Sequence, residues 1–216
     1  LDYRITCSDN PIDISRFARI NLTVGDKDSI AVLARHGISL KAAELASLKE
    51  LVLSSSQGSK ARHYIALPTD NGCMTVFDGK EIRPFLNTGI STISAKCKVL
   101  YYKIFENMMD YLSYVELDSR RSWQMMGITT AIILNGEDNI EEAISFFKKH
   151  KGVEAIQCYF PNDTRGNNLY RYFAREVGRR FIRNKSEDFF PYRSLSEAVR
   201  TKVPSVVMRR LVKWKK

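Results

Sequence analysis

The sequence is poor in the residues that bind structural metals or form disulfides. Only four of its 216 residues are cysteine and three are histidine. The cysteines lie far apart and include no Cys-x-x-Cys pair, which argues against a zinc ribbon and against a disulfide framework. The histidines, His36, His63 and His150, show no ligand spacing and no pairing with a nucleophile. We therefore expect reduced thiols and a cytoplasmic protein.

Long apolar runs and several common enzyme motifs are also missing. No stretch approaches the roughly 18 apolar residues of a membrane span, and Leu1 begins no signal-peptide pattern, so we expect no membrane partner. A start at Leu rather than Met suggests a fragment of a longer protein. The P-loop and the Gly-x-Ser-x-Gly pattern are absent as well. The composition, 44% hydrophobic and 27% charged, is that of an ordinary soluble globular protein.

Acidic residues are scarce in one part of the chain. The net charge is +10, and residues 171–216 contain 14 Lys or Arg against 4 Asp or Glu. The preceding 170 residues contain 20 of each sign. This asymmetry creates a local positive field, for which DNA or RNA is the natural partner. A solvated basic tail is the alternative interpretation.

Two acidic motifs follow apolar, strand-like runs. Glu106 and Asp110 come after residues 99–102, and Asp163 comes after residues 153–160. Carboxylates at the carboxyl ends of parallel strands lie in the crevice where open α/β sheets bind ligands. They are the oxygen ligands that Mg²⁺ prefers, and without a cation they would repel one another unless one were protonated. Alternatively, Glu106 and Asp110 simply favour the N-terminus of a helix.

The first 95 or so residues are predicted to form a small α+β unit. Helices are expected over residues 11–20 and 28–36, and a third is expected to begin after Ser39 and to carry Leu48 and Leu51. Two extended segments should then form a hairpin, because Asn-Gly is a strong turn signal. The hairpin comprises residues 63–68, Asn71-Gly72 and residues 73–77.

From about residue 98 the pattern changes to alternating strands and helices. The strands are expected at residues 99–105, 129–134 and 153–160, with helices over residues 138–150 and after Asp163. The strands are continuous apolar runs, as expected when both faces of a sheet are covered. The order predicts a parallel sheet flanked by helices. A capping box, Ser194 to Glu197, should begin a last short helix that ends at Pro204.

These motifs resemble those of Toprim proteins of bacterial mobile elements. Residues 105–114 are similar to the Phe-Glu-Gly-x-x-Asp motif of that family, residues 132–135 to its second strand, and residues 161–166 to its Asp-x-Asp-x-x-Gly. Upstream segments resemble the uncharacterised domain that commonly precedes Toprim in primase-like, mobilisation and excision proteins. These segments are residues 33–39, 64–68 and 89–93, so the resemblance covers roughly residues 28–200.

The resemblance implies an α/β fold with three parts. Residues 96–193 would form a Toprim-like parallel sheet flanked by helices. Residues 1–95 would form a small α+β domain, and residues 194–216 a basic helical tail. The family further implies Glu106 as the general acid/base or a metal ligand, and Asp110 and Asp163 as ligands of Mg²⁺.

The sequence also departs from the family pattern. Pro161 stands in place of the first Asp of Asp-x-Asp, and Asn107 in place of the Gly. Residues 193–197 correspond to a later Lys-Asp-x-Asn-Glu segment but lack its Asp. A site without these two acids should bind Mg²⁺ weakly if at all. Glu137 and Asp138, directly after the second strand, are candidates to complete the metal site; alternatively they are surface acids that begin the next helix.

An arginine series follows the second motif. Arg171, Arg175, Arg179 and Arg183 recur every four residues, on the face of the expected helix opposite an apolar stripe. Together with Arg165 they are predicted to bind a nucleic-acid backbone, because guanidinium groups suit phosphates. A solvated helix face is the alternative.

Three functions are compatible with these observations. The first is a Mg²⁺-dependent primase or nuclease of a mobile element. The second, which we favour, is a nucleic-acid-binding module of a primase-like, mobilisation or excision protein whose metal site has degenerated. The third is a scaffold whose basic tail contacts an acidic protein. Other mobilisation or replication proteins are expected partners.

Overall fold

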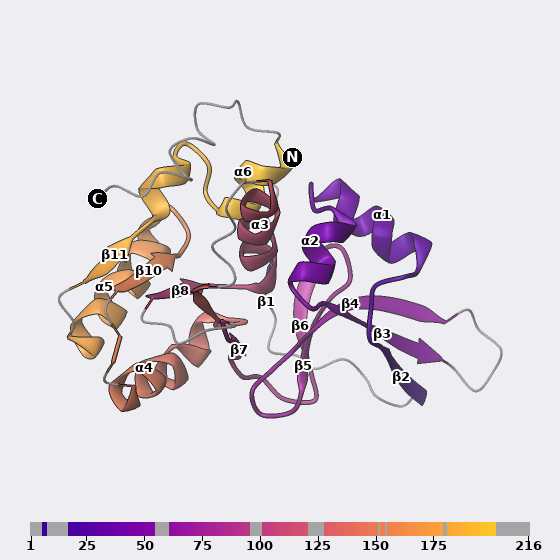
Figure 1. The fold of residues 1–216 in the computed structure, drawn as a ribbon, viewed down its shortest axis with the longest axis horizontal. Helices are drawn as coiled ribbons and strands as arrows, with labels where there is room; N and C mark the ends of the chain where they lie inside the picture. Colours follow the sequence, from indigo (N-terminus) through magenta and orange to yellow (C-terminus); the bar gives the residue numbers. More distant parts are fainter. Residues whose placement is uncertain are drawn as a thin grey trace.

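The structure, a computed structural model, describes most of the chain. Within the described residues the strands form two sheets, with helix α3 (Met108–Ser119) between them (Figure 1). No helix in this part of the chain is long and apolar enough to cross a bilayer. The described residues are 6–7, 17–54, 61–95, 101–120, 128–150, 152–153, 155–178 and 181–201.

The C-terminal sheet has the strand order β11-β10-β8-β9-β7. The pairs β10–β11, β8–β10 and β8–β9 are parallel, and β7 adds an antiparallel edge strand. This arrangement confirms the predicted α/β class and parallel sheet. The strands are β7 (Ser91–Ile93), β8 (Tyr101–Phe105), β9 (Thr130–Ile133), β10 (Ala155–Tyr159) and β11 (Ile182–Asn184).

Both faces of this sheet are buried, as the apolar runs of its strands predicted. Ile104 and Ile132 belong to a core that they share with α4 and α5 on one face. Phe105 and Ile133 belong to the core that contains α3, on the other face. The covering helices on the first face are α4 (Ile140–Lys149), which follows the short 3-10 helix η2 (Glu137–Asn139), and α5 (Thr164–Val177).

The N-terminal sheet has the order β1-β6-β5-β4-β3-β2 and is antiparallel except for the β1–β6 pair. The predicted hairpin is confirmed, since Pro68 pairs with Met74 across the turn that contains Gly72. The elements are β1 (Thr6–Cys7), β2 (Phe17–Asn21), α1 (Lys27–Arg35), α2 (Leu40–Leu45), β3 (Lys49–Ser54), β4 (Arg62–Pro68), β5 (Met74–Phe77) and β6 (Glu81–Phe85).

Helix α3 packs against elements of both halves of the molecule. Every residue from Met108 to Asp118 is buried, and one core cluster joins α3 to α2, to the C-terminal sheet and to α6 (Leu195–Arg200). The backbone N–H and the hydroxyl of Ser39, at the start of α2, donate to Glu116 Oε2 at 2.8 and 2.6 Å. These contacts fix the helix whose first turn carries Asp110.

Two of the predicted helices are wrong in part. Residues 17–20, the described end of the helix expected at 11–20, lie in β2 and pair with β3. The helix capped by Ser39 ends at Leu45, because Ser47 adopts a left-handed conformation (φ 55°). Leu51 therefore lies in strand β3. The expected end of α6 at Pro204 and the tail from residue 202 onward lie outside the described residues.

Candidate functional site

The carboxyl ends of the parallel strands bring the predicted acids to one edge of the sheet. Glu106 follows β8, Glu137 follows β9 and Asp163 follows β10. Asp110 lies one turn into α3, which starts directly after Glu106. The two acidic motifs are therefore adjacent in space, as the strand order predicted. Asp138, in contrast, is exposed and forms no hydrogen bond or ion pair with a described residue.

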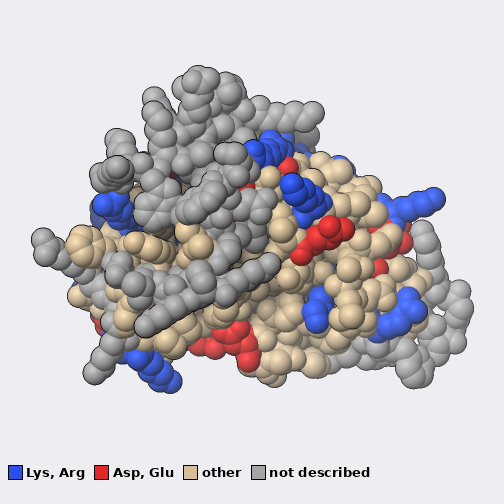
Figure 2. Space-filling model, viewed as in Figure 1, with Lys and Arg blue, Asp and Glu red and all other residues tan. Residues whose placement is uncertain are grey.

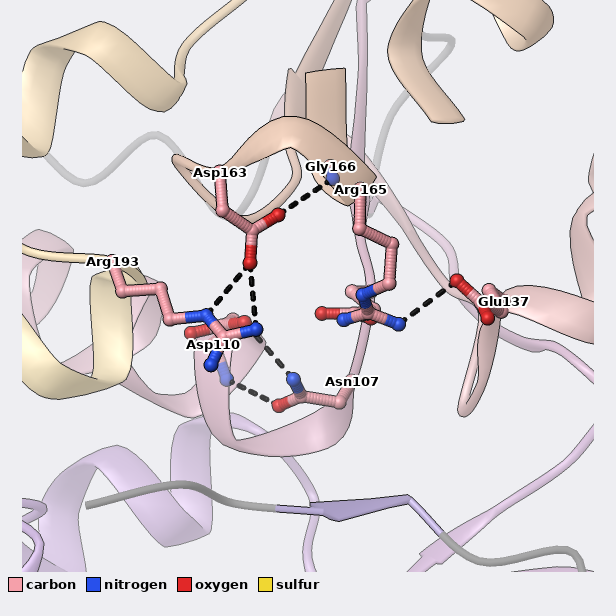
Figure 3. Close-up of polar contacts among 8 residues, drawn as sticks. Asn107, Asp110, Glu137, Asp163, Arg165, Gly166 and Arg193 are labelled. Carbon is pink, nitrogen blue, oxygen red and sulfur yellow. Dashed lines mark hydrogen bonds and ion pairs between the residues drawn. The ribbon is translucent and has the colours of Figure 1, made fainter. Parts of the chain in front are cut away.

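An arginine side chain lies between two of these acids. Arg165, in the first turn of α5, donates from Nη2 to Glu106 Oε1. It also donates from Nη1 to Glu137 Oε2 at 2.9 Å (Figure 3). Glu106 is only 5% exposed. Burial raises the pKa of its carboxyl to about 7, although the positive charge of Arg165 opposes the shift.

Asp110 is enclosed by backbone and amide donors. The Ser196 N–H donates to its Oδ1 at 2.8 Å, and Asn107 Nδ2 donates to its Oδ2 at 3.0 Å. Asn107 also caps α3 by accepting hydrogen bonds from the N–H groups of Met109 and Asp110. Because Asp110 is 1% exposed, burial raises its pKa despite these donors.

Asp163 is paired with the segment that precedes α6. Its Oδ2 accepts a hydrogen bond from Arg193 Nε at 2.7 Å and forms an ion pair with Nη2 at 2.6 Å, while its Oδ1 caps α5 by accepting from the Gly166 N–H at 2.8 Å (Figure 3). Burial acts to raise the pKa of Asp163, but the Gly166 N–H and the Arg193 guanidinium together hold it below its usual range.

The glycine of the second motif is required by close packing. A Cβ atom built on Gly166 would lie 2.0 Å from the carbonyl oxygen of Pro161. The first turn of α5 therefore lies directly on the loop that follows β10. This approach holds Asp163 and Arg165 at the carboxyl edge of the sheet, within the group of acids and arginines that we call the crevice.

The acids of the crevice do not form a magnesium site in this arrangement, because other groups already occupy their carboxylates. Glu106 is paired with Arg165, Asp163 with Arg193, and Asp110 with buried donors. Among the described residues, the one group of three or more acidic, His or Cys side chains whose ligand atoms lie within 4.8 Å of one another is elsewhere, in the N-terminal sheet. Two guanidinium groups thus supply the positive charge that the sequence led us to expect from a metal.

The predicted arginine series is only partly a helix face. Arg171 and Arg175 are exposed on α5, where Arg175 also contacts Glu176 and the ring of Tyr172.

The helix ends at Val177 because Gly178 adopts a left-handed conformation (φ 62°). Arg183 therefore lies on strand β11, which corrects its predicted place on the helix, and Arg179 lies outside the described residues. On the face shown in Figure 2, basic and acidic groups of the described residues are interspersed.

Sequence reasoning did not identify three residues of this site, Asn107, Arg193 and Ser196. The similarity of residues 193–197 to the Lys-Asp-x-Asn-Glu segment was the available signal, since that segment lies against Asp110 and Asp163. Within it, Ser194 caps α6 by accepting from the N–H of Glu197, whose side chain accepts from the Arg193 N–H at 2.8 Å. Hydrogen bonds therefore hold this segment next to Asp110 and Asp163.

Comparisons with known proteins agree with this fold. Residues 103–189 match the profile of the family described as Toprim-like. The chain is similar to the crystal structure of the primase fragment of the bacteriophage T7 primase-helicase protein, with a TM-score of 0.59 and 14% identity over 94% of this chain and 79% of that chain. No curated protein matches the chain.

The chain is also similar to a chain from a second solved structure. This is the bacteriophage T7 lagging-strand DNA polymerase interacting with primase domains of two gp4 subunits bound to an RNA/DNA hybrid and dTTP. The TM-score is 0.60, with 13% identity over 95% of this chain and 98% of that chain. Residues 103–189 therefore form a Toprim-like domain, as the motifs predicted, and the chain shares the fold of the primase fragment.

Proposed function

We propose that this chain is a nucleic-acid-binding module of a primase-like, mobilisation or excision protein of a mobile element. Arg165 and Arg193 would bind the backbone of DNA or RNA at the crevice, and Arg171 and Arg175 would bind it along α5. We propose the same role for Arg183, which is exposed on β11, and for Arg179, which lies outside the described residues. Two comparisons support the proposal, the Toprim-like match and the shared fold with a primase fragment.

The observation that carries the proposal is the placement of two guanidinium groups at the carboxyl edge of the sheet. The side chains of Arg165 and Arg193 are 39% and 41% exposed, so both remain accessible to an anion from solvent. The ion pair between Arg193 and the partly exposed Asp163 contributes only about 0–1 kcal/mol. A phosphate, which guanidinium groups bind through two parallel hydrogen bonds, can therefore compete with Asp163 for Arg193.

The order of the basic groups suits a linear polyanion. Arg165, Arg171 and Arg175 lie on the same helix, whose residues rise about 1.5 Å each, so they extend over about 15 Å. Arg165 lies about 120° round the helix axis from Arg171, so a backbone that contacts both must pass partly round the helix. Phosphates along one DNA strand follow the helix axis at intervals of about 3.4 Å. A backbone that enters the crevice at Arg165 could thus continue along α5.

An active Mg²⁺-dependent primase or nuclease is the second candidate. The observation in its favour is Glu106, a buried carboxyl whose pKa of about 7 suits proton transfer near neutral pH. The pairing of the remaining acids with arginine and backbone donors favours binding without metal chemistry. Replication or mobilisation proteins are the partners that either function implies.

Fluorescence anisotropy with labelled oligonucleotides tests the proposal. Arg165→Gln and Arg193→Gln should each weaken binding to single-stranded DNA, duplex DNA or an RNA/DNA hybrid by about tenfold. Arg83→Gln is the matched control, because Arg83 is 40% exposed and paired with Glu81, but lies in the N-terminal sheet. It removes the same charge and should leave affinity nearly unchanged.

Three results would count against the proposal. Equal losses in all three variants would indicate nonspecific attraction to net charge. Undiminished binding in the two crevice variants would place any nucleic-acid surface elsewhere. No salt-sensitive binding at all would favour the scaffold that contacts an acidic protein. Thermal melts of each variant would establish that a loss of affinity is not a loss of fold.

A further inference from the structure

Three potential metal ligands that are distant in sequence lie close together at the N-terminal sheet. Asp26 caps α1, Glu50 lies on β3 and His63 lies on β4. Glu50 pairs with Ile65 and His63 with Val52, so Glu50 and His63 are diagonal neighbours on one face of the sheet. The histidines showed no ligand spacing in the sequence, because strand pairing and a helix cap create this cluster.

The distance between His63 and Glu50 matches that between two ligands of a small metal ion, and the distance between His63 and Asp26 is longer. His63 Nδ1 lies 3.4 Å from Glu50 Oε2 and 3.9 Å from Asp26 Oδ1. Two ligand atoms that each lie about 2.1 Å from a tetrahedral zinc ion are about 3.4 Å apart. The nitrogen itself is shielded from solvent and has no hydrogen-bond partner in the described structure.

The surroundings of Glu50 also resemble the supporting shell of a metal ligand. Glu50 is 1% exposed, and no Lys or Arg among the described residues forms an ion pair with it. Its oxygens accept from Asn21 Nδ2 at 2.9 Å and from the Asp26 N–H at 3.2 Å. Such hydrogen bonds orient a carboxylate toward an ion. A buried carboxylate next to a second acid is costly without a nearby cation.

We infer that Asp26, Glu50 and His63 bind one divalent transition-metal ion, of the class that includes Zn²⁺, Mn²⁺ and Co²⁺. One imidazole nitrogen with two carboxylates suits these ions, whereas Mg²⁺ favours oxygen ligands alone. Three protein ligands leave at least one position for water or another ligand. His63 also lines a cavity of about 290 Å³ beside α1.

The site would connect α1 to the sheet, independently of the crevice. Helix α1 packs against β4 (Figure 1), and its Leu33 belongs to the core that contains α3. An ion held by the cap of α1 and by two strands would therefore stabilise this packing. Because an ion that binds only the folded chain raises its melting temperature, binding has a readout that does not depend on activity.

Isothermal titration of the untagged 216-residue chain with Zn²⁺ and Mn²⁺ tests the inference, with Co²⁺ absorption as a second readout. Asp26→Asn is the most informative variant, because Asn caps a helix as well as Asp but removes the carboxylate. His63→Gln removes the nitrogen ligand. The matched controls are Asp28→Asn, an exposed acid in the first turn of α1, and His150→Gln, an exposed histidine.

We expect saturable binding of one Zn²⁺ per chain, a visible Co²⁺ spectrum and a higher melting temperature with metal. Asp26→Asn and His63→Gln should each weaken binding by at least about tenfold, whereas the controls should not. Binding that survives both ligand variants, or that is lost in a Glu106→Gln, Asp163→Asn variant, would overturn the inference. No saturable binding would also overturn it and would leave His63 as a simple ion-pair partner of Glu50.

Discussion

Arg193 binds one carboxylate oxygen of Asp163 twice, through a hydrogen bond from Nε at 2.7 Å and through an ion-pair contact from Nη2 at 2.6 Å. Asp163 ends the loop after β10 and begins α5, whereas Arg193 precedes α6. The pair therefore joins two elements that are 30 residues apart at the crevice. Its other consequence is chemical, since Asp163 is neutralised by a side chain of the protein itself.

Asp163 both caps α5 and pairs with Arg193, and two substitutions separate these roles. Asp163→Asn keeps a helix cap and loses the ion pair with Arg193, so it should cost less than about 1 kcal/mol in the free energy of unfolding. Asp163→Ala loses both and should cost about 1 kcal/mol more. Urea unfolding of the two variants measures the difference. Equal stabilities would contradict the role of Asp163 as the cap of α5.

Glu106 should make stability depend on pH in a definite direction. Its pKa is raised from 4.5 to about 7 in the folded chain, so the folded state binds a proton more tightly than the unfolded state. The resulting stabilisation is complete below about pH 4.5 and is lost as the pH rises through about 7. Burial of the charged form would thus cost up to about 3 kcal/mol at high pH.

A Glu106→Gln variant removes this titration while preserving the shape of the side chain. It should be more stable than the parent chain at about pH 8, and the advantage should disappear at about pH 4. Denaturant unfolding of both proteins across this pH range measures the difference between their free energies of unfolding. The titration of other groups largely cancels in this difference. An advantage that is constant with pH would show that Glu106 ionises normally.

The contact between Gly166 and Pro161 predicts a severe packing defect. In Gly166→Ala the new methyl group would meet a backbone carbonyl at 2.0 Å, so α5 must shift, at a cost of at least about 2 kcal/mol. Gly25→Ala is the control, because a Cβ at Gly25 meets nothing within 4 Å. Thermal or urea unfolding compares them. Similar stabilities of the two variants would refute the close approach.

The attachment of α3 to α2 rests on Ser39. Ser39→Ala removes both the cap of α2 and the hydroxyl that donates to the buried Glu116, so we expect a loss of about 2 kcal/mol. Ser119→Ala, which removes only a hydroxyl bonded to the Glu116 carbonyl, should cost clearly less. Circular dichroism during urea unfolding provides the comparison, and a neutral Ser39→Ala would contradict this account.

Strands β8, β9 and β10 and helices α4 and α5 were predictable because their signals are local, whereas β7 and β11 were not predicted as strands. Continuous apolar runs mark strands covered on both faces, and Ile140, Ala143 and Ile144 mark the buried stripe of α4. The same reasoning failed at residues 17–20, where pairing with β3 determines the structure. It failed again after Leu45, where Leu48 and Leu51 continue a helical spacing that the backbone at Ser47 interrupts.

The candidate site was predictable to the same extent. Glu106 and Asp163 could be placed because each directly follows a strand. Their partners could not, because an ion pair between residues 106 and 165 or 163 and 193 depends on how helices and loops meet in three dimensions. The acids were expected to need a metal or a proton, and the structure provides guanidinium groups instead. The cluster around His63 was missed for the same reason.

The measurement that most directly tests the central claim is the salt dependence of DNA binding in EDTA and in excess Mg²⁺. The claim is that arginines, without a metal, bind the phosphates at the crevice. Binding should be complete in EDTA and no tighter in Mg²⁺, which itself competes for the phosphates, and the slope of log K against log salt should fall by about one to two units in an Arg165→Gln, Arg193→Gln variant. Binding that requires Mg²⁺, or an unchanged slope in the variant, would contradict the claim.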